Sequence, residues 1–185
     1  MPASPSPGST AGLVFRPATA ADYPAICGLI NDEDELFLVH PRGRFPLTEA
    51  QLTELATQRR GFTVGECRGE VVAFANFYDF SPAGHAFIGN LVVAATQRRR
   101  GLGRRLVEHM LERAREDYRL AAVRISVFAD NTPALLLYGA AGFVPCGMEE
   151  RRDPRGRRRA LLHMEKCLTP PAPGREADTE VDGQG

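Results

Sequence analysis

The segment Gln97–Gly103, Gln-Arg-Arg-Arg-Gly-Leu-Gly, combines the residue types that bind phosphate groups. Residues 86–93 before it are apolar, end in β-branched side chains and contain no proline, which predicts a buried strand. After it, apolar residues recur at helical spacing from Leu102 to about Tyr118. A strand, a glycine turn and a helix start leave several backbone N–H groups free at one point, where the helix dipole and the arginines add positive charge. The segment is therefore predicted to bind phosphates.

The spacing of the glycines distinguishes between kinds of phosphate loop. A Walker A loop needs a Gly-Lys-Ser/Thr ending, and Lys166 is the only lysine in the chain. A dinucleotide-binding loop needs a third glycine, and none follows at the required position after Gly103. Arg98, Gly101 and Gly103 instead fit the pattern Arg/Gln-x-x-Gly-x-Gly. This pattern resembles the acetyl-CoA pyrophosphate loop of the GNAT family of N-acetyltransferases.

A second segment, downstream of the loop, resembles the same family. Residues 131–134 (Asn-Thr-Pro-Ala), Tyr138 and residues 142–143 (Gly-Phe) fit its Asn-x-x-Ala-x-x-x-Tyr-x-x-x-Gly-Phe segment. Two independent motifs in the right order are more specific than either alone, and the resemblance extends over residues 14–168. It implies an α/β fold with a GNAT-like mixed, mostly antiparallel sheet, helices on both faces and a splayed pair of central parallel strands.

The remaining segments predict the elements that position the two motifs. A first helix is expected after Thr19, its N-cap, and a second helix over residues 48–59, with Thr48 as cap and Gln51 completing a capping box. Residues 31–46 carry no clear pattern, although the resemblance places the acceptor site beside them. The order is β α α β β β α β α β β. The other predicted strands cover residues 13–16, 62–66, 71–78, 121–128, 143–150 and 158–166, and the last helix covers residues 132–141.

Length and composition suit one domain, residues 13–168, between flexible tails at residues 1–12 and 169–185 that are rich in Pro, Gly and polar residues. The formal net charge is zero, which argues against bulk attraction to nucleic acid or a membrane. No apolar run approaches the length of a membrane span, and no signal-peptide pattern is present. We therefore expect a cytoplasmic protein, and the resemblance is compatible with a homodimer.

The reaction implied by the resemblance is acetyl transfer from acetyl-CoA to an amine acceptor, without a metal. The amine attacks directly in a ternary complex, so holding both substrates together supplies most of the rate. The backbone of Leu91, Val92 and Val93 would hold the pantetheine arm like an added strand. Asn131 would bind this arm or serve only as a helix cap. The pyrophosphate would be held mainly by backbone N–H groups of Arg98, Arg99, Arg100, Gly101, Leu102, Gly103 and Arg104.

The family resemblance indicates a residue for the catalytic acid but not for the catalytic base. Tyr138 falls where the family places the hydroxyl that protonates the leaving thiolate. Some relatives carry a glutamate base on the strand before the loop or on the next strand, where this chain has Asn90 and Ser126. The base is therefore left unassigned among the remaining candidates, Glu33, Asp34, Glu35, Asp79 and His85.

Two other classes of function remain alongside the enzyme. The domain could be a non-catalytic sensor that binds acyl-CoA, and such a sensor would not need Tyr138. Arginines at positions 98–100 and within residues 151–159 could contact RNA. The second cluster contains no aromatic residue for base stacking, however, which argues against nucleic-acid binding. The sequence does not identify the amine acceptor.

Overall fold

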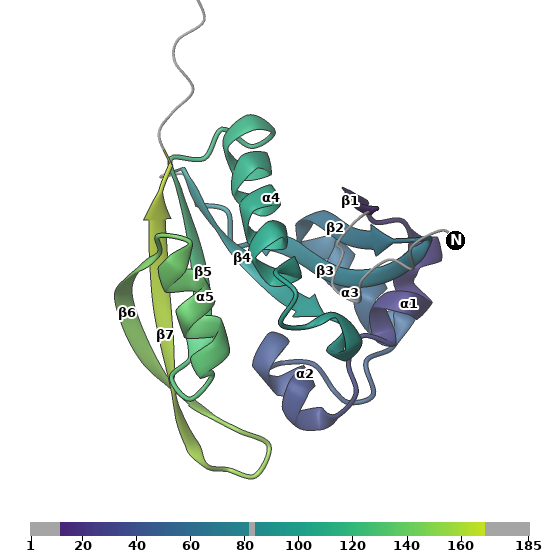
Figure 1. The fold of residues 1–185 in the computed structure, drawn as a ribbon. Helices are drawn as coiled ribbons and strands as arrows, with labels where there is room; N and C mark the ends of the chain where they lie inside the picture. The colour runs from purple at the N-terminus through teal and green to yellow at the C-terminus, as the bar shows by residue number, and fades with distance from the viewer. Residues whose placement is uncertain (1–11, 82–83, 169–185) are drawn as a thin grey trace, which may run out of the picture.

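A central sheet organises the molecule (Figure 1). The computed structural model describes residues 12–81 and 84–168. Apart from Gly12, both predicted tails lie outside the described residues, as do Pro82 and Ala83. In the described part, the strand order is β1-β2-β3-β4-β5-β7-β6, and β4 and β5 form the parallel pair. The strands are β1 (Leu13–Pro17), β2 (Arg60–Cys67), β3 (Glu70–Tyr78), β4 (His85–Val93), β5 (Ala122–Phe128), β6 (Val144–Arg152) and β7 (Arg158–Cys167).

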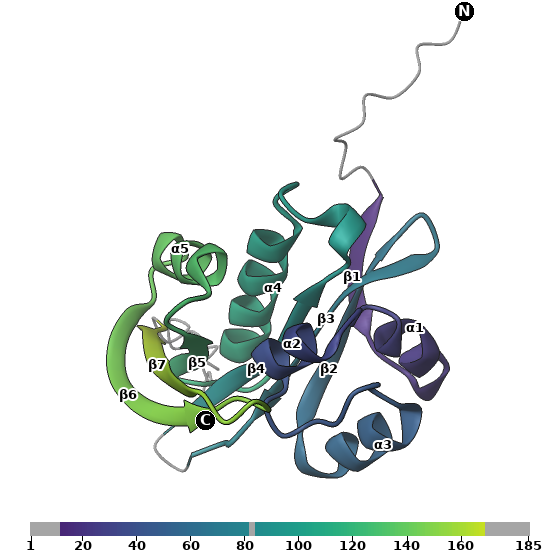
Figure 2. The same ribbon diagram turned by 90° about the horizontal axis from the view of Figure 1, so that it is seen from below.

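The helices lie on both faces of the sheet, as predicted (Figure 2). Helices α4 (Leu102–Glu116) and α5 (Thr132–Ala140) cover one face, and α1 (Tyr23–Cys27) and α3 (Glu49–Gln58) lie on the other. Helix α2 (Glu33–Val39) contacts β4. Two short 3₁₀ segments, Ala20–Asp22 and Ala95–Gln97, precede α1 and α4. The predicted α/β fold class is confirmed.

Each face of the sheet has its own apolar core. On one face, α4 buries a stripe at helical spacing that includes Leu106 and Met110, against Phe77 and Ile125 of the strands. On the other face, α1 and α3 pack on a second cluster centred on Phe74. The periodic apolar residues that predicted α4 are therefore the ones that contact the sheet.

The structure corrects the sequence interpretation in residues 31–46, which contain α2. Asp32 is the N-cap of this helix, and its side chain accepts a hydrogen bond from the backbone of Glu35 at 2.7 Å. Three acids in the first turn, residues 33–35, suit the positive end of the helix dipole. The acidic run of residues 32–35 is thus the start of a helix.

Only one of the two hydrogen bonds of the capping box predicted at the start of α3 is present. The Thr48 side chain accepts a hydrogen bond from the backbone of Gln51, as expected. The Gln51 side chain, however, reaches the preceding loop and bonds both backbone groups of Arg44 at 3.0 Å. A full capping box is present earlier in the chain, between Thr19 and Asp22.

A β-bulge interrupts β4 where it pairs with β3. Phe74 pairs with Val92 and Asn76 with Gly89, so two residues of β4, Asn90 and Leu91, oppose one residue of β3. Asn90 has a φ of 51°, in the left-handed region. The extra residue reverses the alternation of the strand. Before the bulge, even-numbered residues of β4 face α4, whereas after it Val92 packs in the core on the opposite face.

Candidate active site

Strands β4 and β5 separate at the bulge, which creates the splayed pair that the sequence predicted. Their parallel pairing runs from His85 with Ala122 to Ile88 with Ile125 and ends there. From Gly89 to Val93, β4 remains paired with β3 but presents its other edge without a strand partner in the described structure. An open edge of this kind can pair with the amides of an extended ligand. Residues 91–93, predicted to hold the pantetheine arm, lie on this edge.

The predicted phosphate loop joins this edge to α4. Arg99 has a φ of 59° and Gly101, the N-cap of α4, a φ of 81°. No side chain of the described residues caps the helix, and its first backbone bond runs from the Arg105 N–H to the Gly101 carbonyl. The N–H groups of Leu102, Gly103 and Arg104 therefore have no acceptor within the helix. Together with the helix dipole, they fit a pyrophosphate.

The arginine side chains of the loop are engaged in local contacts. Arg98 donates from Nε to the Val93 carbonyl at 2.9 Å and pairs through Nη2 with Glu35 of α2. Arg104 pairs with Glu108 one turn later at 2.8 Å. Binding of the pyrophosphate by the loop backbone, and direct contacts of Arg98, Arg99, Arg100 and Arg104 with the cofactor, stay predictions.

A cavity of about 850 Å³ lies at the splayed strands. It is bordered by residues 37–42 at the end of α2, by the end of α3, by the end of β3, by residues 87–91 of β4, and by β5, β6 and β7. Tyr138 of α5 lines it as well. The site therefore joins the open edge of β4 to a space that can hold an acceptor. Residues on its wall that matter below are Arg42, Arg59, Tyr78, Asp79, Gly89, Ser126, Tyr138, Glu149 and His163.

Tyr138 packs in the core and also lines the cavity. It is 6% exposed, and its ring lies 6.1 Å from that of Phe143. Its hydroxyl has no hydrogen-bond partner among the described residues, yet no fully buried side-chain oxygen there lacks a partner, so the hydroxyl reaches the cavity. Burial raises the pKa of Tyr138 above its ordinary value. The phenol therefore keeps its proton at neutral pH.

Asn131 serves as the N-cap of α5. Its side-chain oxygen accepts a hydrogen bond from the backbone N–H of Ala134 at 3.3 Å, and proline follows in the first turn at position 133. Of the two roles that the sequence left open, the cap is present. Binding of the cofactor by Asn131 stays a prediction.

Of the five candidate bases from the sequence, Asp79 is the one that lines the cavity. Glu35 bonds the backbone of Asn31 at 2.9 Å, and Asp34 pairs with an arginine at 3.1 Å. His85 contacts Arg124 at 3.1 Å, away from the cavity wall.

A histidine that the sequence analysis did not single out lies behind Ser126. The Ser126 hydroxyl is 2.8 Å from Nδ1 of His163 on β7. Nε2 of the same ring is 3.7 Å from a carboxylate oxygen of Glu149, and the ring meets Phe87 edge-on. Ser126 and His163 are direct register partners of β5 and β7. The sequence predicted β5 and β7 as strands with alternating side chains, but it did not predict that these two strands are neighbours.

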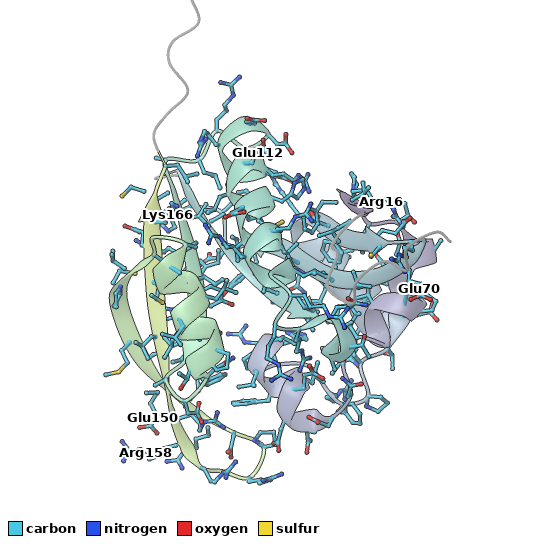
Figure 3. The ribbon with its side chains drawn as sticks, viewed as in Figure 1. Arg16, Glu70, Glu112, Glu150, Arg158 and Lys166 are labelled. Atoms are coloured by element: carbon cyan, nitrogen blue, oxygen red, sulfur yellow. The ribbon has the colours of Figure 1, made fainter. Side chains whose placement is uncertain are left out.

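Each arginine of the second basic cluster forms an ion pair with an acid among the described residues. Arg158 contacts Glu150 at 2.6 Å, and Figure 3 shows the two side chains together on the β6–β7 hairpin. Arg157 pairs with Asp153 at 2.6 Å, and Arg159 with Asp130 at 2.6 Å. These pairs form an ion-pair network on the hairpin surface.

The described residues contain no group of three or more His, Cys, Asp or Glu side chains arranged to hold a metal ion. No helix among them has the length and apolar composition needed to cross a membrane.

The splayed parallel strands, the uncapped glycine loop and the adjoining cavity are the features that the family resemblance implied. The chain belongs to the acetyltransferase (GNAT) family, whose model matches residues 26–143. Its co-substrate is acetyl-CoA, as the sequence resemblance implied.

Solved structures show the same fold. The ribosomal-protein-alanine N-acetyltransferase from Brucella melitensis is 29% identical, with a TM-score of 0.70 over 84% of this chain and 99% of that one. The spermidine N-acetyltransferase from Vibrio cholerae, determined with CoA and spermine, is 19% identical, with a TM-score of 0.72 over 85% and 96% of the two chains. The yncA protein from Salmonella typhimurium, determined with its cofactor acetyl-CoA, is 18% identical, with a TM-score of 0.68 over 88% and 98%.

Proposed function

We propose that this protein transfers the acetyl group of acetyl-CoA to a primary amine by direct attack within a ternary complex. One observation carries the proposal. The Tyr138 hydroxyl and the Ser126–His163 pair line one cavity, at the point where β4 leaves β5. A candidate proton donor and a candidate proton acceptor thus line one cavity beside the predicted cofactor groove.

Acetyl-CoA would be bound by the backbone of two segments. The uncapped N–H groups at the start of α4 would hold its pyrophosphate, and the open edge at residues 91–93 would hold its pantetheine amides. The thioester supplies an activated acetyl group whose leaving group is a thiolate. The residues of this chain therefore need to place an amine, remove its proton and return a proton to sulfur.

Tyr138 would return the proton to sulfur. Because burial raises its pKa, the phenol is protonated at neutral pH and can act as a donor. Its position on α5, next to the cavity, supports this role.

His163 would receive the proton of the amine through Ser126. Glu149 lies on the Nε2 side of the ring, which favours the proton on Nε2 and leaves Nδ1 free to accept from the Ser126 hydroxyl. The amine would give its proton to the Ser126 oxygen as that hydroxyl passes its own proton to Nδ1. No charge then remains on the serine.

The experiment that tests the proposed function measures two properties of the full chain. Acetyl-CoA at ~100 times its dissociation constant should stabilise the fold by roughly 2.7 kcal/mol, seen as a higher melting temperature. CoA release should then depend on an amine from a broad panel. Gly103→Glu should abolish the thermal shift, since its Cβ would lie 3.3 Å from Leu137 and its carboxylate would repel phosphate. A melting temperature that acetyl-CoA leaves unmoved would overturn the proposal.

A further inference from the structure

Arg59 is held in a fixed position on the cavity wall. Its Nη1 donates to the side-chain oxygens of Asn90 at 2.7 Å and Asn76 at 3.2 Å. Its Cζ lies 4.6 Å from the centre of the Tyr78 ring, a cation–π contact. The guanidinium is thereby oriented by three neighbours before any ligand arrives.

The backbone leaves room for this guanidinium. A Cβ on Gly89 would lie 2.5 Å from Nη1 of Arg59 and 2.8 Å from Cδ1 of Tyr78. A glycine at position 89 therefore permits Arg59 and Tyr78 to reach the point where β4 leaves β5. The arrangement of the site therefore requires glycine at position 89, whereas the strand pairing does not.

The positive charge of Arg59 has no counter-ion in the structure. Within residues 12–81 and 84–168, no carboxylate forms an ion pair with Arg59 or with Arg42, which lines the same cavity. A half-buried guanidinium bonded only to neutral amides is unfavourable compared with one that binds an anion. Arginine also presents its donors in a fork that matches a carboxylate or a phosphorus oxyanion.

The neighbouring ionisable groups are consistent with a positive potential at this end of the cavity. Burial lowers the pKa of His40 to about 4, and the charges of Arg59 and Arg42 lower it further. Glu149 is engaged by Arg151, with 2.7 Å between them. Asp79 is the remaining acid on the cavity wall, and it is exposed.

One side chain, Tyr78, spans the distance between the cationic end and the proton-accepting pair. Arg59 lies over its ring, and burial raises the pKa of its phenol, while the neighbouring Ser126 hydroxyl offsets part of that rise. A molecule that touches Arg59 with one group and presents an amine at Ser126 is therefore small. A polyamine or a basic peptide would bring positive charge to Arg42 and Arg59 and be repelled.

We propose that the acceptor is a small primary amine that carries an oxyanion, a carboxylate or a phosphorus oxyanion, and that Arg59 binds this oxyanion with help from Arg42. The proposal rests on the proposed function, because it names the acceptor class of the same site. It makes Arg59 a residue that determines specificity, with no role in proton transfer.

The test measures CoA release with amines in matched pairs. Free α-amino acids are compared with their amides, and aminoalkylphosphonates with alkylamines of equal length; spermidine and a basic peptide with a free N-terminus complete the set. The anionic member of a pair should have the higher kcat/KM by about 10–100-fold. The carboxylate and phosphonate arms separate the two sources of the oxyanion. Equal or better turnover of amides, spermidine or the peptide would overturn the inference while leaving the proposed function intact.

Two variants locate the effect. Arg59→Gln should raise KM for the anionic amine by about 10–100-fold and leave its neutral partner nearly unchanged, which removes the discrimination. Arg68→Gln, an exposed arginine on the β2–β3 hairpin, is the matched control. The acetyl-CoA thermal shift reports folding in each variant.

If Arg59→Gln does not fold, Arg42→Gln must reduce the discrimination instead. An equal loss for both amines of a pair would count against the inference, and no CoA release with any amine would overturn the proposed function and the inference together.

Discussion

The hydroxyl of Tyr138 is the part of this residue that packing does not explain. The ring belongs to the core below α4 and α5, whereas the hydroxyl makes no hydrogen bond within the described residues and borders the cavity. Tyr138→Phe therefore removes only this hydroxyl and leaves the packing in place. Turnover should fall by about 10²–10⁴-fold. The melting temperature and the acetyl-CoA shift should stay at the parent values, and turnover within about twofold of the parent would refute the role.

His163 is expected to accept the proton of the amine through Ser126. His163→Gln keeps a side chain that can bond Ser126 but cannot accept a proton, so kcat/KM should fall by about 10²-fold or more at neutral pH. His85→Gln, on the same sheet but outside the cavity, is the control and should keep the parent kcat/KM. If His163→Gln keeps the parent kcat/KM and Asp79→Asn loses it, the base is Asp79.

Residue types identified part of the candidate site and could not identify the rest. Tyr138 and the loop glycines could be named as candidates because each lies in a contiguous motif, and their roles stay predictions. His163 and Arg59 were not found because their neighbours are brought together by strand pairing. In particular, β7 lies between β5 and β6, so Ser126 faces a residue 37 positions away. Nothing in the sequence distinguished this order from one with β6 beside β5.

At the level of elements, the start of α4 depends on a left-handed backbone at Gly101. An added Cβ at this position meets no atom within 4 Å, so alanine would cost stability through its φ of 81° alone, roughly 1–2 kcal/mol. Gly69 in the β2–β3 hairpin is a matched position, with a φ of 83° and equally open surroundings. Both alanine variants should lower the melting temperature by similar amounts. Gly101→Ala alone should weaken the acetyl-CoA shift, and an equal shift in both variants would show that the loop conformation does not matter for binding.

The elements themselves were largely predictable because their apolar positions are periodic. The predicted helix over 102–118 ends at Glu116, and the predicted strand over 158–166 ends at Cys167. Helix α2 was missed because its seven residues contain only two that are buried, Leu36 and Phe37, too few to establish a period. The bulge at Asn90 was also missed, since an extra residue in a strand has no fixed sequence signature.

At the scale of the whole molecule, His40 on the cavity wall makes the stability of the fold depend on pH in the acid range. Its pKa is about 4 in the folded protein and 6.5 as an ordinary histidine, so the unfolded chain binds the proton more tightly. Stability should therefore fall as pH decreases from about 6.5 to 4, by on the order of 2 kcal/mol from this residue. Urea unfolding at pH 7 and pH 4 should show a smaller loss for His40→Gln than for the parent. His109, whose pKa burial also lowers, would keep part of the loss. An unchanged loss in the variant would exclude His40 as its source.

The bulge in β4 makes the length of the strand a functional property in its own right. Removing one residue at Asn90–Leu91 would restore simple alternation, with Val92 still opposite Phe74 and facing away from α4, and would let β4 continue beside β5. The groove and the cavity would close together in one step. A substitution cannot do this, because it leaves the number of residues unchanged. Inheritance of this site therefore requires a conserved residue count between Ile88 and Val93, and a single-codon deletion there is more damaging than most replacements in the same strand.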